Sequence, residues 1–447
     1  DLIPIPQDRR TWTWQGFAGY WIITEGANNS AWTAGSTMLA LGLSVPQAMG
    51  SVSDMLFTFC IILTRYRSWG MIGGFWPVLN RIVTACIWMG VQTYWGGQAV
   101  KIILGAVIGP KTAHGAGELF HSPATESGST LSWNVVYGIQ AILGLWSGGI
   151  VGQSDWTRYA KTQNASIFGQ GVTCPLTIIV TALCGVIITS ASATIYGEYF
   201  WNPFELLLQI QLVSMTPAAR AGTFFAGLCF LASQMALCIV LNAMSTGMDM
   251  AALCPRWINI RRGCYILTVI AVAICPWNFV NTVTTFINVL SGWSIFLSGM
   301  TGILIFDYFL VRGRQLHTGD MYRGNKTSAY WYTSGFNWRA IVAWIMGIWP
   351  LLPGFIRRIR QVSDGNGWDH VYDLSYFFGF FVSGTIHWAL HTAFPAKKQT
   401  GSSPFEMELH RTRPAQVHGV RPRAYAESTT SQEYETVTMG REKESNV

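Results

Sequence analysis

Long apolar stretches, separated by short polar links, dominate residues 16–394. A helix rises 1.5 Å per residue, so about 20 apolar residues are needed to cross a hydrocarbon core roughly 30 Å thick. We expect about ten membrane-spanning helices, at 16–43, 47–64, 78–108, 133–152, 171–193, 220–244, 263–283, 285–311, 339–356 and 373–394. The second stretch is short, and polar residues interrupt the first. The pattern predicts an all-α, polytopic membrane protein.

Two of these expected helices contain features that favour a local break. The first includes Thr24-Glu25-Gly26-Ala27-Asn28-Asn29-Ser30, and the fourth includes Gly144, Gly148, Gly149 and Gly152. A carboxylate and amides inside a membrane are costly and usually face a cavity or a partner. Paired, interrupted helices indicate the central site of a secondary transporter. Close helix packing is the alternative explanation of the glycines.

The composition agrees with a membrane protein. Half of the 447 residues are hydrophobic and 11% are charged, whereas soluble domains are about 25% charged. The 21 tryptophans fit the enrichment of this residue at membrane interfaces. The net charge of +7 comes from short basic clusters between apolar stretches, a pattern typical of cytoplasmic loops, so we expect no nucleic-acid partner.

Charge asymmetry predicts the orientation. If the spans alternate, most basic residues fall on one side, which the positive-inside rule makes the cytoplasm, and both termini lie there. Arg357, Arg358 and Arg360 fall on the opposite side and disagree with the rule. We divide the chain into a cytoplasmic N-terminal segment (1–14), a transmembrane transporter domain (15–394) and a tail (395–447).

The tail differs from the rest of the chain because it is rich in Ser, Thr, Glu, Lys and Arg and has no apolar period. This composition predicts a disordered cytoplasmic segment. Trafficking or ubiquitin machinery could bind there, and a plain solvated tail fits the sequence equally well.

No catalytic or metal-binding constellation is visible. The nine cysteines form no CxxC pair, so neither a disulfide framework nor a zinc site is indicated. His387 and His391 are four residues apart, but no acidic residue lies near them in the sequence, and we expect them to pack in the last helix. We predict no enzyme, no metal and no cofactor.

Many short motifs occur together in a recognisable order. Upstream are Arg10-Thr11-Trp12, Tyr94-Trp95-Gly96-Gly97 and Ser154-Asp155-Trp156-Thr157-Arg158-Tyr159; downstream are Asn202-Pro203, Asn242-Ala243-Met244-Ser245, Pro276-Trp277-Asn278, Asp307-Tyr308, Asn337-Trp338-Arg339-Ala340 and Leu352-Pro353-Gly354-Phe355. Together they resemble the nucleobase–cation symporter-1 family, in its fungal uracil/allantoin/uridine permease branch. The resemblance implies a LeuT-like inverted-repeat fold of twelve helices and inward symport of a nucleobase or related heterocycle.

The chain departs from the family pattern in its first half. Ile61-Ile62-Leu63 is followed almost at once by Ser68-Trp69-Gly70, and one polar link, 111–132, leads directly to Trp133. The family's fourth and fifth helices are therefore missing from the pattern, which leaves about ten of the twelve. A truncated membrane protein that does not transport is consequently an alternative interpretation.

The resemblance also implies a substrate site. Trp88 and Gln92 are four residues apart and share a helix face, where the indole would stack on a flat base and the amide would bind its edge. Trp146 matches the second stacking tryptophan of the family, with Leu145 and Gly148 beside it. Asn242 matches its ligand-binding asparagine, and an amide offers a donor and an acceptor side by side. We also expect Asn28, on the first helix, to bind the substrate at this site.

Sodium-coupled relatives have small hydroxyl residues just before that asparagine. The equivalents here are Ser233, Ala236 and Leu237, and a leucine offers no oxygen to sodium. We therefore expect proton coupling, with Glu25 as the carrier and Ser233 as a further coupling residue. Lys101 and Asp54 are alternative carriers.

The resulting hypothesis is a plasma-membrane, multi-pass proton symporter that imports a nucleobase, with uracil the first candidate and allantoin the second. Uridine, thiamine and nicotinamide riboside permeases of the same family are alternatives, because they share these motifs. The expected partners are a small heterocycle and the lipid bilayer.

Overall fold

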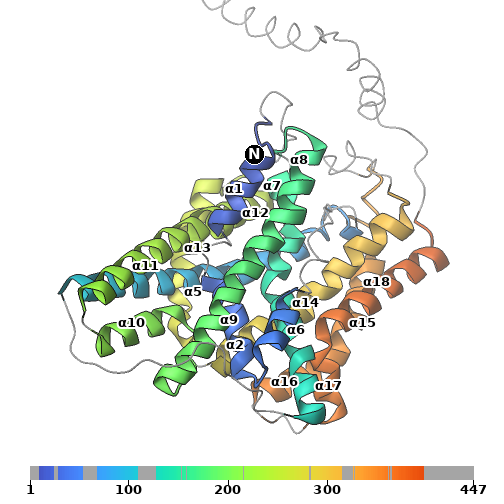
Figure 1. The fold of residues 1–447 in the computed structure, drawn as a ribbon. Coiled ribbons are helices and arrows are strands. Elements are labelled where there is room, and N and C mark those ends of the chain that lie inside the picture. The colour runs from blue at the N-terminus through green and yellow to red at the C-terminus, as the bar shows by residue number, and fades with distance from the viewer. Residues whose placement is uncertain are drawn as a thin grey trace, which may run out of the picture.

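The computed structural model describes residues 10–396, apart from 25–28, 54–67, 109–126, 153, 158, 215, 281–282, 315–325, 327, 361 and 363–364. The described residues are mostly helical, and their only β pairings are two isolated bridges, Trp12 with Ala160 and Thr333 with Phe336. Figure 1 shows the helices as one bundle, with the N-terminal segment at one end and the helical turns α16 and α17 at the other.

The described helices lie largely within the predicted stretches, but most of the second stretch, 54–64, lies outside the described residues. Their bounds are α1 Trp14–Thr24, α2 Asn29–Ala40, α3 Val45–Ser53, α5 Phe75–Ile108, α6 Gly128–Gly152, α7 Ser154–Thr157, α8 Gln163–Phe168, α9 Cys174–Tyr196, α10 Pro203–Val213, α11 Pro217–Ala236, α12 Ser245–Leu253, α13 Ile260–Ala273, α14 Val283–Phe306, α15 Trp338–Ile348, α16 Leu352–Ile359, α17 Gly367–Asp373 and α18 Ser375–Ala393. Three π-helical segments, Gly169–Thr173, Leu237–Met244 and Asp307–Val311, continue α8 into α9, join α11 to α12 and extend α14.

Four helical stretches among the described residues are long and apolar enough to cross a membrane: Asn164–Tyr196, Pro217–Leu253, Thr285–Val311 and Trp338–Ile359. The helices α5 and α6 have 34 and 25 residues, and α18 has 19, and they are not among these four stretches. The chain is thus a multi-pass membrane protein, and the number of ten spans stays a prediction.

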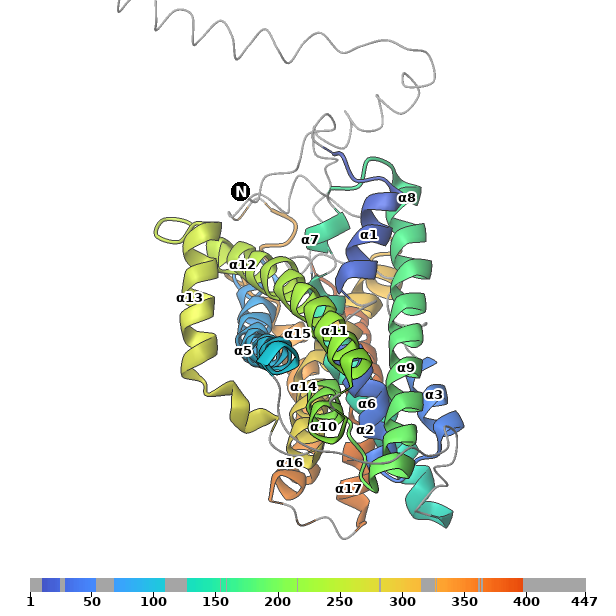
Figure 2. The ribbon, with the colours of Figure 1, turned by 60° about the vertical axis from the view of Figure 1, so that its left-hand side comes forward.

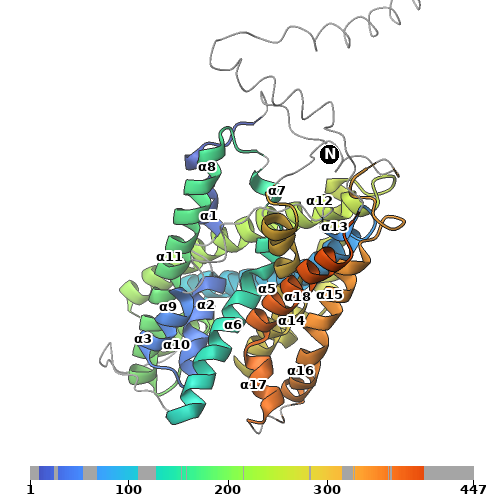
Figure 3. The same ribbon diagram turned by 90° about the vertical axis from the view of Figure 1, so that its right-hand side faces the viewer.

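The helices form two groups around a centre. The helix α14 packs along α6 and α18, and α15 packs on α18, so these four form one side (Figure 3). On the other side α2 packs on α9 and α3. The helices α5 and α11 pack on each other and cross the upright helices at a steep angle (Figures 1 and 2). In this crossing α5 contacts both α6 and the α11–α12 junction.

The predicted interruption of the first span falls between two separate helices. The helix α1 ends at Thr24 and α2 begins at Asn29, and the intervening Glu25 and Asn28 lie outside the described residues. The helix α10 was not predicted, because its 11 residues are too few to span a bilayer. Its start is nevertheless encoded, since the Asn202 side chain accepts a hydrogen bond from the Phe204 amide and Pro203 occupies the first turn.

The basic cluster near residue 358, which disagrees with the predicted orientation, is paired with acidic residues in the structure. Arg357 pairs with Asp369 at 2.9 Å, and Arg358 pairs with Asp373 at 2.6 Å while lying over the Tyr137 ring. Burial alone would raise the pKa of Asp369, but the hydrogen bond and charge of Arg357 outweigh it and lower that pKa. Two of the three positive charges are therefore compensated within the hairpin of α16 and α17.

Small residues allow α2 and α9 to approach closely. A Cβ on Gly185 would lie 2.5 Å from the carbonyl oxygen of Trp32, and one on Gly35 would lie 2.7 Å from that of Ala182. Glycines in this role are common where membrane helices pack through their backbones.

We therefore expect Gly185→Ala to separate α2 from α9 and to lower the free energy of unfolding by about 1–3 kcal/mol, as overpacking does. The measurement is the melting temperature of the purified protein. It is the temperature at which heating removes half of the protein from its monodisperse elution peak. Gly222→Ala is the control, because a Cβ there meets no atom within 4 Å. Equal melting temperatures for the two variants would contradict the close approach.

Candidate functional site

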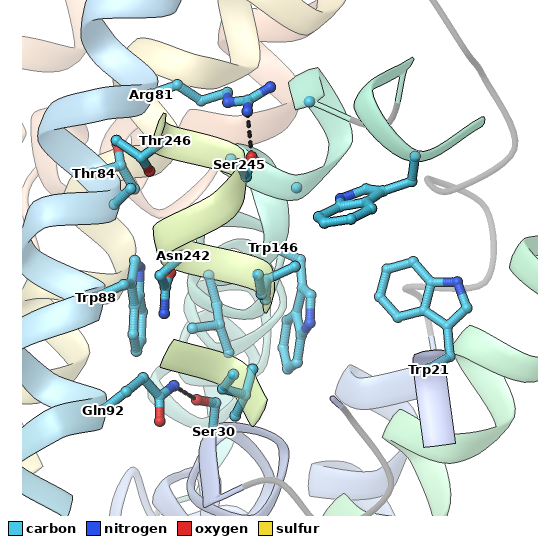
Figure 4. A pocket seen from close by; sticks show the side chains of 18 residues that line it. Trp21, Ser30, Arg81, Thr84, Trp88, Gln92, Trp146, Asn242, Ser245 and Thr246 are labelled. Carbon is cyan, nitrogen blue, oxygen red and sulfur yellow. Dashed lines mark hydrogen bonds between the residues drawn. The ribbon is translucent and has the colours of Figure 1, made fainter. Parts of the chain in front are cut away.

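A pocket of about 110 Å³ lies where α5, α6 and the α11–α12 junction meet the ends of α1 and α2 (Figure 4). Its volume is several times the roughly 10–15 Å³ that one water needs. The lining consists of Trp21, Ser30, Arg81, Thr84, Ala85, Trp88, Gln92, Leu145, Trp146, Gly148, Gly149, Gly152, Trp156, Leu237, Leu241, Asn242, Ser245 and Thr246. The structure thus brings Trp88, Gln92, Trp146, Gly148 and Asn242 to one cavity, as the motifs imply for a substrate site.

Two indoles form walls of the pocket. Trp88 of α5 and Trp146 of α6 are 8% and 7% exposed, and Figure 4 shows Asn242 between them in that view. Trp88 packs edge to face on the Phe286 ring, with the two ring centroids 6.3 Å apart. Flat aromatic faces of this kind suit a planar ring, because they supply dispersion and area burial.

Amide groups supply the polar part of the lining. Gln92 donates from Nε2 to Ser30 Oγ at 2.5 Å, which joins α5 to α2. Among the described residues its Oε1 has no hydrogen-bond partner, nor does the indole nitrogen of Trp88. The Asn242 amide makes no hydrogen bond with the other lining residues (Figure 4). Because unpaired buried polar groups cost free energy, a bound solute with a donor and an acceptor edge would stabilise this arrangement.

A π-helical turn positions the asparagine. Residues Leu237–Met244 form π-helix between α11 and α12, and three residues of this turn, Leu237, Leu241 and Asn242, line the pocket. Such turns widen a helix locally and are frequent at functional sites. This turn was not predicted from the sequence, since the segment is as apolar as its neighbours and has no glycine or proline to mark a change.

A buried ion pair lies at one end of the pocket, and it too was not predicted. Arg81 of α5 contacts Asp249 Oδ2 of α12 at 2.8 Å, with side chains 6% and 3% exposed. It also donates to Ser245 Oγ at 2.5 Å. A signal was available, because an arginine inside an apolar stretch requires a partner or a cavity.

The expected coupling residues are only partly described. Ser233 Oγ donates to the carbonyl oxygen of Ile23 at 3.4 Å, so it lies beside the last turn of α1. Leu237 is buried and lines the pocket, whereas Lys101 is exposed on α5 and does not line it. Glu25, Asn28 and the alternative carrier Asp54 fall outside the described residues.

A second polar cluster corrects the expectation for the two histidines. Asp307 lies beside them: its Oδ1 is 3.4 Å from His387 Nε2, and one ligand atom from each of Asp307, His387 and His391 lies within 4.8 Å of the others. The expectation of no acidic partner was wrong, because Asp307 lies far earlier in the chain, in the π-helical segment that extends α14. Arg312 binds the other carboxylate oxygen at 3.3 Å, and Asn337 contacts His391 at 3.2 Å. Since Arg312 already compensates the carboxylate, we interpret the cluster as a junction between α14 and α18.

Comparison with known proteins places this architecture among permeases. Residues 58–116 and 110–379 match the profile of a family described as "Permease for cytosine/purines, uracil, thiamine, allantoin". An uncharacterized permease of Schizosaccharomyces pombe is 32% identical over 78% of this chain and 72% of the relative. The allantoin permease and the uracil permease of Saccharomyces cerevisiae are 29% and 27% identical, each over 88% of this chain and 75% or 76% of the relative. These relatives are permeases, not enzymes.

Solved structures show the same fold. The transporter Mhp1, of the nucleobase-cation-symport-1 family, matches in its inward-facing conformation with a TM-score of 0.66 and 17% identity, over 90% of this chain and 96% of that one. In a closed conformation with bromovinylhydantoin bound, Mhp1 matches with a TM-score of 0.58 and 18% identity, over 89% and 96%. At this level of identity the likeness establishes a shared transporter fold.

The alignments also agree with a gap in the first half of the chain. The two profile matches meet at residues 110–116, inside or beside the predicted link 111–132. The allantoin permease aligns over 483 positions with 88% of the 447 residues, or about 393, so about 90 positions have no counterpart here.

Proposed function

Since the chain belongs to the family of permeases for cytosine/purines, uracil, thiamine and allantoin, we propose that it imports a nucleobase or related heterocycle across the plasma membrane by proton symport. Uracil is the first candidate substrate and allantoin the second. The observation that supports this proposal most is the pocket in which the indoles of Trp88 and Trp146 meet two amides.

In the proposed complex the planar ring lies between Trp88 and Trp146. Asn242 offers its carbonyl and amino group to one edge of the ring, and Gln92 Oε1 accepts from a ring N–H. Gly148 leaves room beside the ring, because a Cβ there would have Thr84 as its nearest neighbour, at 3.7 Å. A pocket built on such hydrogen bonds rejects flat solutes that leave its amides unpaired.

The charge of the lining favours a neutral substrate. Arg81 is the one charged residue among the eighteen described residues that line the pocket, and none of them is acidic. Relatives of this chain include a thiamine transporter and a nicotinamide riboside transporter of Saccharomyces cerevisiae, each 30% identical. Thiamine and nicotinamide riboside are cations. Because Asp249 pairs with Arg81 and no acidic side chain is among the described residues that line the pocket, the lining favours uracil, allantoin or uridine.

Uptake of labelled uracil tests the proposal. The full chain, fluorescently tagged, is expressed in yeast that lacks its own uracil and allantoin permeases, with unlabelled allantoin, uridine and thiamine as competitors. We expect uptake that uracil or allantoin inhibits and thiamine does not. A second candidate function, a non-transporting membrane protein, is favoured by the gap near residue 110. Protein at the cell surface without uptake of any of these solutes would support it.

The coupling ion has its own test. We expect uptake to be faster at acidic than at neutral pH and independent of sodium, and Glu25→Gln to remove the acid stimulation, because the amide cannot bind the proton. Ser233→Ala is expected to reduce uptake less, since the hydroxyl only supports the end of α1 through Ile23. Initial uptake rates at matched surface expression measure both effects. Stimulation by sodium, or acid stimulation that survives Glu25→Gln, would contradict this assignment.

A further inference from the structure

The pocket ends at a contact between two helices. On α5 the lining stops at Arg81, and on α6 it stops at Gly152. Arg81 precedes Trp88 by about two helical turns, so this end lies away from the indoles and toward the start of α5. In the predicted orientation that end faces the cytoplasm. Figure 4 shows Arg81 beyond Asn242, with Ser245 as its hydrogen-bond partner.

Gly152 provides the surface on which the guanidinium lies. A Cβ at this position would lie 2.5 Å from Arg81 Cζ and closer still to Nη1. Real Cβ contacts are longer, so any side chain at 152 would displace the guanidinium. Gly149, one turn earlier on the same helix, differs, because a Cβ there meets nothing within 4 Å. The requirement for glycine is therefore specific to the position that Arg81 covers.

The guanidinium is held by α12. Its partners Asp249 and Ser245 both belong to α12, which packs on α5. On the α6 side Gly152 presents no side chain. If α6 moves away from α5 and α12, Arg81 keeps its ion pair with Asp249, so the separation leaves neither charge unpaired. A buried charge that lost its partner would cost several kcal/mol.

We propose that Arg81 closes this end of the pocket by resting on Gly152, and that parting of this contact opens the path between the pocket and the predicted cytoplasmic side. Arg81 is thus a positioning residue that sets access to the site. The proposal rests on the proposed function only in that the pocket is taken as the solute path.

A cysteine in the pocket reports this access without any substrate. Thr84→Cys places a thiol three residues from Arg81, on the lining of the pocket. Inside-out vesicles containing the full chain are treated with a membrane-impermeant methanethiosulfonate reagent, and labelling is measured above that of the parent with Thr84 retained. We expect Gly152→Ala to raise the labelling rate several-fold and Gly149→Ala to leave it unchanged.

A second substitution tests whether the raised labelling comes from the contact of Arg81 with Gly152 or from a general destabilisation of the protein. Arg81→Lys keeps a positive charge for Asp249 but removes the planar guanidinium that covers Gly152. We expect Arg81→Lys alone to raise the labelling rate, and Gly152→Ala to add little in that background. The two changes are then non-additive, as expected for residues in contact. Monodisperse elution of each variant shows that it is folded.

Two results would overturn the proposal: equal effects of Gly149→Ala and Gly152→Ala, or an effect of Gly152→Ala that is the same with Arg81 and with Lys at position 81. If Gly152→Ala does not fold, Arg81→Lys decides, because unchanged labelling would show that the guanidinium does not bar the path. Labelling requires no transport, so the expected pattern without uptake of any heterocycle would refute the proposed function alone.

Discussion

Asp249→Asn is expected to lower the free energy of unfolding by about 3–5 kcal/mol, the cost of leaving one member of a buried ion pair without its partner. Arg81 is buried, and the substitution removes the carboxylate that contacts it while Ser245 continues to accept its hydrogen bond. The hydroxyl cannot balance the charge. We therefore expect a lower melting temperature and less protein at the cell surface.

The matched control is Asp369→Asn, an equally small change at the Arg357–Asp369 pair. Arg357 is 26% exposed on its side chain, so water can solvate the charge that loses its partner. Asp369→Asn should therefore lower the free energy of unfolding clearly less than Asp249→Asn does. Ion pairs with an exposed member contribute little, because the solvent competes for them.

Removal of both charges separates stability from function. In Arg81→Met/Asp249→Asn neither charge of this pair remains, and we expect much of the lost stability to return. Uptake should not return with it, since the guanidinium that lies against Gly152 is absent. A melting temperature of Asp249→Asn equal to that of the parent would contradict the buried pair.

The sequence predicted the helices and part of the site for physical reasons. Apolar length determines which segments cross a bilayer, and the spacing of four residues placed Trp88 and Gln92 on one face of α5, where both line the pocket. Asn242 entered through the family motif and lies in the same pocket. Each of these predictions depends on local pattern or on a run of neighbouring residues.

The features that the sequence did not predict depend on contacts between distant segments. Arg81 and Asp249 meet because α5 crosses the α11–α12 helix. Asp307 reaches the two histidines of α18 across the packing of α14 on α18. The π-helical turn around Asn242 has no residue signature, because backbone register is decided by packing on both sides. Hydrophobic periodicity contains no information on any of these pairings.

Trp88→Ala is expected to raise the apparent KM for the transported heterocycle about 5- to 150-fold. Stacking of a base on an aromatic side chain contributes about 1–3 kcal/mol, and 1.4 kcal/mol corresponds to a factor of ten. Trp88→Phe should retain most of the affinity, because a smaller ring still stacks. Loss of ground-state binding raises KM with little change in the maximal rate.

Trp95 offers a matched control on the same helix. Both indoles contact the Phe286 ring, Trp88 at 6.3 Å and Trp95 at 5.6 Å, but Trp95 is fully buried and does not line the pocket. Trp95→Phe should therefore reduce the amount of folded protein and leave KM unchanged. An equal rise of KM in both variants would mean that Trp88 acts through the packing around Phe286. An unchanged KM in Trp88→Ala would place the solute elsewhere than between the two indoles.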